Sequence, residues 1–220
     1  MSNFSAARKN MVDCQIHPSG VIDEKILEAF ATIPRESYLE TNQSPIAYQD
    51  EDIVMKDGRF ILEPTIHARM IDALDLNPDS TILDIGHAGG YSSAILSSLV
   101  STVIALEQKQ KYITAAEKVW LEHDICNIVA LKSTLSKGAP EHAPYPFIIL
   151  NGSVAEIPQK LIDQLDINGK MVLILRAPDQ IMGQVQLIQH LGEGKHSTMT
   201  LFEAAAPYLV GFEPAQSFNF

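Results

Sequence analysis

Short apolar runs alternate with longer amphipathic stretches from Thr81 towards the end of the chain, and this alternation constrains the fold more than any other feature. Such apolar runs predict strands that are buried on both faces, as in a parallel sheet covered by helices. The last two runs alternate polar and apolar residues instead, which is typical of antiparallel strands at a sheet edge. The expected strands are residues 81–85, 102–107, 128–131, 147–150, 171–175, 185–187 and 198–202. We therefore predict an α/β fold with a doubly wound, mostly parallel seven-stranded sheet.

The first third of the chain has the pattern of helices and loops. One helix is expected to begin at Asp23-Glu24 and to end before Pro34. Another is expected to begin at Pro64 and to carry apolar residues on one face as far as Leu74. We expect the 220 residues to form a single domain, with a helical N-terminal extension and substrate-side segment over 1–76 and a ligand-binding core over 77–220.

Charge and composition exclude several classes of function. The net charge is −11, and nucleic-acid binding requires many basic groups to neutralise phosphates, so we expect no nucleic-acid partner. Residues 1–10 are polar, and no apolar run approaches the roughly 18–20 residues that span a bilayer. Cys14 and Cys126 stand alone and are interpreted as reduced thiols. These features predict a cytoplasmic protein without a membrane segment, and no His, Cys or Asp cluster has the spacing of a metal site.

The most informative segment is the glycine-rich turn Asp84-Ile-Gly-His-Ala-Gly-Gly-Tyr91, which follows the first expected strand. Glycine at such a turn lets the backbone approach a ligand, and the next helix points its N-terminus at that ligand. The second strand ends in Glu107, and an acid there can accept hydrogen bonds from both hydroxyls of a ribose. An ordinary strand–helix turn followed by a surface glutamate would give the same pattern.

Two cofactor classes use this layout. Dinucleotide enzymes have G-x-G-x-x-G, which cradles a pyrophosphate. Here Gly86, Ala88 and Gly90 stand at every second position after Asp84, which resembles the D/E-x-G-x-G-x-G turn of S-adenosylmethionine-dependent methyltransferases. This spacing favours S-adenosylmethionine over a nicotinamide cofactor.

Four further segments resemble one family. They resemble its V-P-R-E-x-F, A-Y-x-D and G-Q-T-I-S-Q-P segments and its F-D-x-I-I-V strand with the following I-P, in the same order and spacing. In this chain they are Ile33–Tyr38, Ala47–Asp50, Gly58–Met70 and Tyr145–Pro158. The chain is thereby identified as a divergent member of the protein-L-isoaspartate O-methyltransferase family. The resemblance implies a Rossmann-like methyltransferase fold and methyl transfer from S-adenosylmethionine to the carboxylate of L-isoaspartyl residues in damaged proteins. S-adenosylhomocysteine would be the product, and a protein or peptide the substrate.

The resemblance also carries over site positions. The cofactor-binding positions are Asp84, Gly86, His87, Ala88, Gly90, Glu107, Gln108, Ser133, Thr134 and His67. The substrate-side positions are Phe60, Ile61, Leu62 and Asn151. No residue is assigned as catalytic. His67 could equally be a helix-surface histidine, and His87 is expected to point to solvent rather than to bind a ligand. Trp120 is expected to pack in the core.

Three departures from the family fall on ligand positions. The family's T-I-S segment reads Phe60-Ile61-Leu62, so two hydroxyl groups beside the substrate are replaced by apolar side chains. The middle glycine of the turn is Ala88, and the family's G-D-G aligns with Ser133-Thr134-Leu135. Two alternatives therefore stay open. One is a catalytically impaired member that binds cofactor or a protein partner, and the other is a methyltransferase with a different acceptor.

Overall fold

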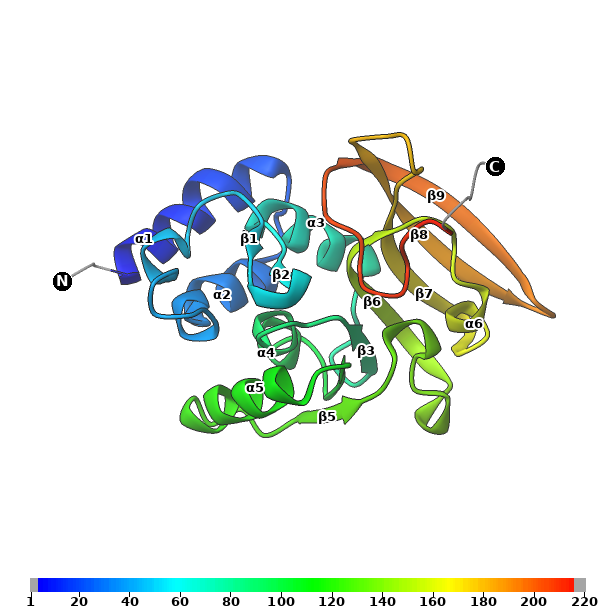
Figure 1. Cartoon of the computed structure of the whole chain (residues 1–220), viewed down its shortest axis with the longest axis horizontal. Coiled ribbons are helices and arrows are strands. Elements are labelled where there is room, and N and C mark those ends of the chain that lie inside the picture. The colour runs from blue at the N-terminus through cyan, green and yellow to red at the C-terminus, as the bar shows by residue number, and fades with distance from the viewer. Residues whose placement is uncertain (1–3, 216–220) are drawn as a thin grey trace.

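The computed structural model describes residues 4–215, and its centre is one seven-stranded sheet in the order β5-β4-β3-β6-β7-β8-β9 (Figure 1). The strands are β3 (Thr81–Ile85), β4 (Thr102–Glu107), β5 (Ile128–Lys132), β6 (Tyr145–Val154), β7 (Leu165–Leu175), β8 (Gly183–Gly192) and β9 (Lys195–Ala204). The first five are parallel, and β8 and β9 pair antiparallel at one edge. The predicted α/β fold and its mostly parallel sheet are confirmed.

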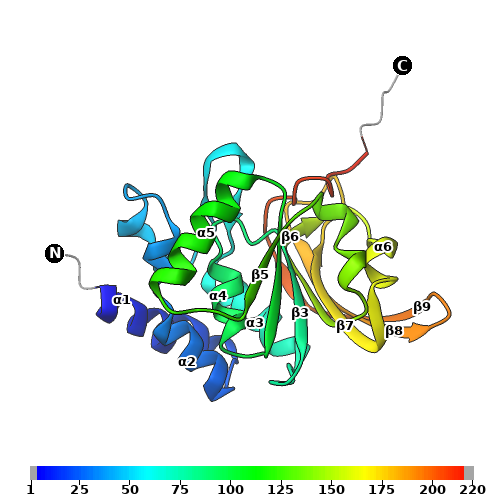
Figure 2. The ribbon, with the colours of Figure 1, turned by 90° about the horizontal axis from the view of Figure 1, so that it is seen from below.

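Helices cover both faces of this sheet. Helices α3 (Pro64–Leu74), α4 (Tyr91–Ser97) and α5 (Gln110–Glu122) lie on one face, and α6 (Gln159–Ile162) lies on the other (Figure 2). Right-handed crossovers explain this division, because β3–α4–β4 and β4–α5–β5 step in one direction along the sheet while β6–α6–β7 steps in the opposite direction. The strand order therefore reverses beside β3.

The N-terminal third packs against α3 and α4. It contains α1 (Phe4–Met11), a π-helical turn at Val12–Ile16 and α2 (Glu24–Thr32), as the helical pattern predicted. The Asp23 carboxylate caps α2 by accepting hydrogen bonds from the backbone N–H of Lys25, at 2.8 Å, and of Ile26. A small hairpin, β1 (Ile53–Val54) with β2 (Phe60–Ile61), leads into α3.

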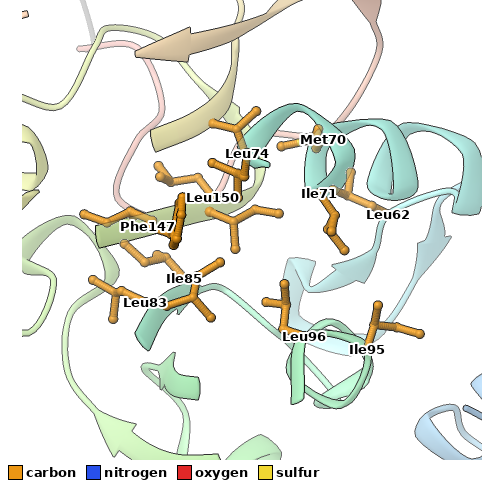
Figure 3. Packing of buried hydrophobic residues seen from close by; sticks show 14 of the residues in the cluster. Leu62, Met70, Ile71, Leu74, Leu83, Ile85, Ile95, Leu96, Phe147 and Leu150 are labelled. Atoms are coloured by element: carbon orange, nitrogen blue, oxygen red, sulfur yellow. The ribbon is translucent and has the colours of Figure 1, made fainter. Parts of the chain in front are cut away.

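One continuous apolar core joins these parts. Figure 3 shows Leu62 among the side chains of Met70, Ile71 and Leu74 from α3, next to those from β3, β6 and α4. Leu62 exposes 2% of its surface, so it belongs to this core. Trp120 is also buried, as expected.

The bounds of several elements differ from those expected, since β6, β7, β8 and β9 are each longer than the predicted strands. Helix α6 extends only over Gln159–Ile162, because Leu165 already pairs with Tyr145 at the start of β7. The chain then bulges at 166–169, where Asn168 has a φ of 65°, before the regular pairing resumes at Lys170. Over residues 4–215, no helix is long and apolar enough to cross a membrane.

Candidate functional site

The carboxyl ends of β3, β4 and β6 meet where the strand order reverses. Open α/β sheets bind ligands at such a point. Asp84 lies near the end of β3, Glu107 ends β4, and Asn151 lies in β6. The fold therefore brings the two predicted acids and the predicted amide to one edge of the sheet.

Asp84 is fully buried and already bonded on both carboxylate oxygens. It accepts hydrogen bonds from Ser92 Oγ at 3.0 Å, from Ser93 Oγ and from Asn151 Nδ2. Asn151 Nδ2 also donates to the carbonyl of Ile85 at 3.1 Å. Burial raises the pKa of Asp84, and these donors oppose the rise.

Glu107 is also fully buried, and its carboxylate forms a salt bridge with an arginine. Arg59 Nε lies 3.1 Å from each Glu107 oxygen, and its second nitrogen Nη2 lies 2.7 Å from Oε1. The backbone N–H groups of Gln108 and Lys109 donate to the same Oε1 at 2.7 and 2.9 Å. The Arg59 and Glu107 side chains expose 3% and 0% of their surface. Glu107 is thus not the surface glutamate of the simpler interpretation, and its partner is another side chain of the same protein.

Sequence reasoning missed Arg59. It stands where the family's G-Q-T-I-S-Q-P segment has glutamine, directly after Gly58. A basic residue aligned with that uncharged position was the available signal. Its partner could not be read from the pattern, because the two residues are separated by 48 positions in the chain.

The turn after β3 holds three residues at positive φ. These are Gly86 at 78°, Ala88 at 50° and Gly90 at 95°. A Cβ on Gly86 would lie 2.8 Å from Leu209, and one on Gly90 would lie 2.6 Å from the Cβ of Ala116. Glycine is therefore required at both ends of the turn. Ala88 adopts the left-handed conformation at a cost of roughly 1–2 kcal/mol.

The space above this turn is almost filled. The remaining cavity is about 10 Å³, close to the volume that one water molecule needs. Known ligand pockets measure roughly 300–1,000 Å³. The cavity is lined by the predicted substrate-side residues Phe60, Ile61, Leu62 and Asn151 together with His67, Gly86, His87 and Ser92. The structure thus places the four predicted substrate-side residues around one cavity with three of the predicted cofactor residues and leaves little room between them.

Apolar side chains from three segments fill this space. The Phe60 ring lies over Gly152, where a Cβ would meet Phe60 Cζ at 2.6 Å. Leu209, which follows β9, and Leu135, which follows β5, both face Gly86. All three side chains are buried. Leu135 stands at the last position of the segment that aligns with the family's G-D-G, so a glycine of the pattern is replaced here by a space-filling residue.

Both histidines are buried. His67 Nε2 lies 3.1 Å from Ser92 Oγ, and burial lowers the pKa of His67 to about 3, so the ring is neutral. The helix-surface interpretation of His67 is therefore wrong. His87 exposes 2% and its ring centroid lies 5.7 Å from that of Trp120, so the expectation that it points to solvent is wrong as well. Within the described range 4–215, neither ring nitrogen of His87 bonds to another residue.

Seven of the ten predicted cofactor positions do not line the cavity, and three of these seven are not buried. Gln108 and Thr134 are exposed, and Ser133 is half-buried. The Ser133 N–H donates to the backbone carbonyl of Glu107 at 3.3 Å, so these residues follow the ends of β4 and β5 on the outer side of Glu107. The structure does not bring them together with Asp84.

A second buried arginine lies on the other side of the cavity. Arg35 is fully buried, donates from Nη2 to the carbonyl of Leu62 at 2.8 Å and stacks 4.9 Å from the centroid of the Tyr91 ring. The positive charge of Arg35 acts on two carboxyl groups, those of Asp52 and Glu63, whose pKa values are nevertheless raised. Burial raises the pKa of Asp52 to about 6, and burial with the neighbouring Asp50 raises that of Glu63 to about 7. Over the described part of the chain, no group of three His, Cys, Asp or Glu residues is placed to hold a metal ion.

The sequence is similar to one family of known proteins, in the family model and in individual relatives. The sequence model of the family described as "Protein-L-isoaspartate(D-aspartate) O-methyltransferase (PCMT)" matches residues 6–206. The protein-L-isoaspartate O-methyltransferase of Koribacter versatilis is 32% identical over 180 residues, which are 81% of each chain. That of Protochlamydia amoebophila is 36% identical over 163 residues, which are 74% of this chain and 78% of the relative.

Solved structures share the fold. A protein-L-isoaspartate O-methyltransferase superposes with a TM-score of 0.83 at 23% identity, over 94% of this chain and 67% of that chain. A putative protein-L-isoaspartate O-methyltransferase from Plasmodium falciparum, solved in complex with S-adenosyl-L-homocysteine, superposes with a TM-score of 0.76 at 20% identity. That match covers 94% of this chain and 97% of the other.

Proposed function

Because this chain belongs to the protein-L-isoaspartate O-methyltransferase family, we propose that it transfers a methyl group from S-adenosylmethionine to the carboxylate of L-isoaspartyl residues. The observation that carries the proposal is the family match over residues 6–206, which includes the N-terminal segment as well as the sheet. The substrate is then a damaged protein or peptide, and the role is protein repair in the cytoplasm.

The reaction explains why no protein base needs to be assigned. S-adenosylmethionine supplies the methyl group, and the accepting carboxylate is already ionised at neutral pH. Transfer to such a group depends on alignment and on exclusion of water. The edge of the sheet between Asp84 and Glu107 supports this assignment, because both acids are fully buried and held by hydrogen bonds.

The cofactor can be tested against the residues present. The polar layout suits it, since Asp84 and Glu107 lie near the ends of neighbouring parallel strands and could take its amino and ribose groups. The space does not suit it, because the cavity is about 10 Å³ and Arg59 holds the Glu107 carboxylate. The structure as it stands therefore does not accommodate S-adenosylmethionine, and binding requires Arg59 and Phe60 to move.

Two other functions are each favoured by one observation. The closed cavity favours a family member without methyltransferase activity that acts through a protein partner. The apolar Phe60 and Leu62 favour a methyltransferase whose acceptor is not an isoaspartyl carboxylate, because neither side chain can donate a hydrogen bond to that group.

The test is methyl transfer from labelled S-adenosylmethionine to an isoaspartyl peptide. The matched control is the same peptide with normal aspartate, and the control enzyme is Glu107→Gln, which removes the charge at the end of β4. We expect base-labile label in the isoaspartyl peptide alone, and less of it with Glu107→Gln. Absence of label in the isoaspartyl peptide at high enzyme concentration would exclude the repair function. Label in a different acceptor would favour a methyltransferase that acts on a group other than an isoaspartyl carboxylate.

A further inference from the structure

Arg59 is carried by a small, weakly anchored hairpin. Strands β1 and β2 have two residues each, and a tight loop joins them. Two-stranded hairpins have little stability of their own in water. The hydroxyl of Tyr112 in α5 donates a hydrogen bond to the carbonyl of Lys56 at the hairpin tip. Asp57 at the tip also pairs with Lys111 and, at 3.4 Å, with Lys109. These side chains are 40–53% exposed, and such surface pairs contribute little.

The buried end of the hairpin is held differently. The Arg59 guanidinium makes a two-nitrogen contact with Glu107, and both side chains are almost completely removed from water. Charge-assisted hydrogen bonds of this geometry are stronger than hydrogen bonds between neutral groups. Removing one partner would leave the other charge buried without a counter-charge. Arg59 is therefore the main polar anchor that keeps the hairpin over the site.

We propose that Arg59 is an internal competitor of the cofactor, because it occupies the Glu107 oxygens that the ribose hydroxyls would need and thereby controls access to the site. The inference rests on the proposed function, since it assumes that the cofactor binds between Asp84 and Glu107. Glu107 Oε1 already accepts from Arg59 and from two backbone N–H groups, and Oε2 accepts from Arg59 Nε. While Arg59 stays, Oε1 is fully used and Oε2 accepts from Arg59 Nε, so the carboxylate cannot accept from both hydroxyls of a diol.

The same movement would also remove Phe60 from the cavity. Phe60 follows Arg59 directly and pairs with Val54 in the hairpin. Its ring lies against Gly152 at the edge of the site. Lifting the hairpin would therefore free Glu107 and the space beside Gly86 together. Because the open state is then a minor population, the apparent affinity for the cofactor falls by the fraction that is open.

The test is a titration with S-adenosylhomocysteine, followed by the fluorescence of Trp120. This residue is the only tryptophan of the chain, donates from Nε1 to the Gly90 carbonyl at 3.0 Å and lies beside His87. Arg59→Gln introduces the neutral residue of the family segment. Lys111→Gln removes one ion pair of the hairpin tip, and Lys111 lies outside the cavity. Lys118→Gln removes an exposed charge elsewhere on α5 and is the control.

We expect Arg59→Gln to bind at least about tenfold more tightly than the unaltered protein, Lys111→Gln to bind more tightly by a smaller factor, and Lys118→Gln to bind as the unaltered protein does. Should Arg59→Gln fail to fold, Arg59→Met keeps the aliphatic stem and carries the same expectation. Equal affinity of the unaltered protein and the Arg59 variant would overturn the inference and leave the proposed function standing. No binding by any of the proteins would overturn both.

Discussion

The guanidinium of Arg59 spans both carboxylate oxygens of Glu107 at 2.7–3.1 Å, where the Arg59 side chain is 3% exposed and the Glu107 side chain is fully buried. Glu107 stands at the end of β4, the position at which an α/β sheet offers an acid to a ribose. The chain thus satisfies with its own arginine an acid that this sheet layout places where a ligand can bind. Several consequences can be measured without any cofactor.

Breaking this pair should be costly. Arg59→Ala leaves a buried carboxylate and Glu107→Ala leaves a buried guanidinium, so each change should lower the free energy of unfolding by about 3–5 kcal/mol. The double variant should lose much less than the sum, because no charge is left unpaired. Urea denaturation of the four proteins measures the coupling. The exposed pair Lys118–Glu122 is the control and should show little coupling. Additive losses at Arg59 and Glu107 would contradict the buried pair.

The close contact between Gly86 and Leu209 predicts a second effect. Gly86→Ala adds a Cβ at a φ of 78° and 2.8 Å from the Leu209 side chain, so strain and overpacking act together. The expected loss of stability is about 2–4 kcal/mol. Gly192→Ala is the matched control, because its φ is 82° and nothing lies within 4 Å of the added atom. The loss should shrink when Leu209 is also replaced by alanine, and an equal loss at Gly86 and Gly192 would refute the contact.

Asn151 should matter for stability as well as for any ligand. Its amide joins the Asp84 carboxylate to the Ile85 carbonyl across two strands. Asn151→Ala removes both hydrogen bonds from buried acceptors and should cost about 1–3 kcal/mol. Asn127, whose amide bonds exposed and half-buried carbonyls at the other end of the sheet, provides the comparison. If Asn151→Ala lowers the free energy of unfolding no more than Asn127→Ala does, the hydrogen bonds around Asp84 do not contribute the expected stability.

The carboxyl group of Glu63 predicts a pH dependence. Burial and the neighbouring Asp50 and Asp52 raise its pKa to about 7, and the unfolded value is about 4.3. The native protein therefore holds this proton more tightly than the unfolded chain does. The resulting stability is fully present below about pH 4 and is lost as the pH rises through 7.

Glu63→Gln should remove this dependence. Its Tm should exceed that of the unaltered protein at pH 8, and the difference should become smaller as the pH falls towards 4.5, because the unaltered side chain becomes protonated in the native state. Asp179→Asn removes an exposed carboxylate far along the chain and should show no such trend. A Tm difference that stays constant between pH 5 and pH 8 would contradict the raised pKa.

The fold was predictable because the strands are so apolar. Residues 81–85 and 102–107 have the composition of strands covered on both faces, and their ends then place Asp84 and Glu107 at one edge by topology alone. The resemblance to the family supplied the remaining site positions, and the structure brings Phe60, Leu62 and Asn151 together as a group. Their roles stay predictions.

What could not be predicted depends on contacts between distant segments. Arg59 meets Glu107 and Leu209 meets Gly86 only after the hairpin and the C-terminal segment pack on the sheet, and no local pattern encodes either contact. His87 was expected to point to solvent because it lies inside a glycine turn, yet its ring is buried next to Trp120 of α5. At such positions, tertiary packing and not the local sequence pattern determines whether a side chain is buried and which residues it contacts.

The most direct test of the account is a crystal structure of the Arg59→Gln protein with S-adenosylhomocysteine. We expect the ribose hydroxyls within hydrogen-bond distance of both Glu107 oxygens, the amino end of the ligand on the Asp84 side, and the Phe60 ring displaced from Gly152. A ligand bound elsewhere, or a closed cavity with Phe60 and Leu209 still against Gly152 and Gly86, would contradict it.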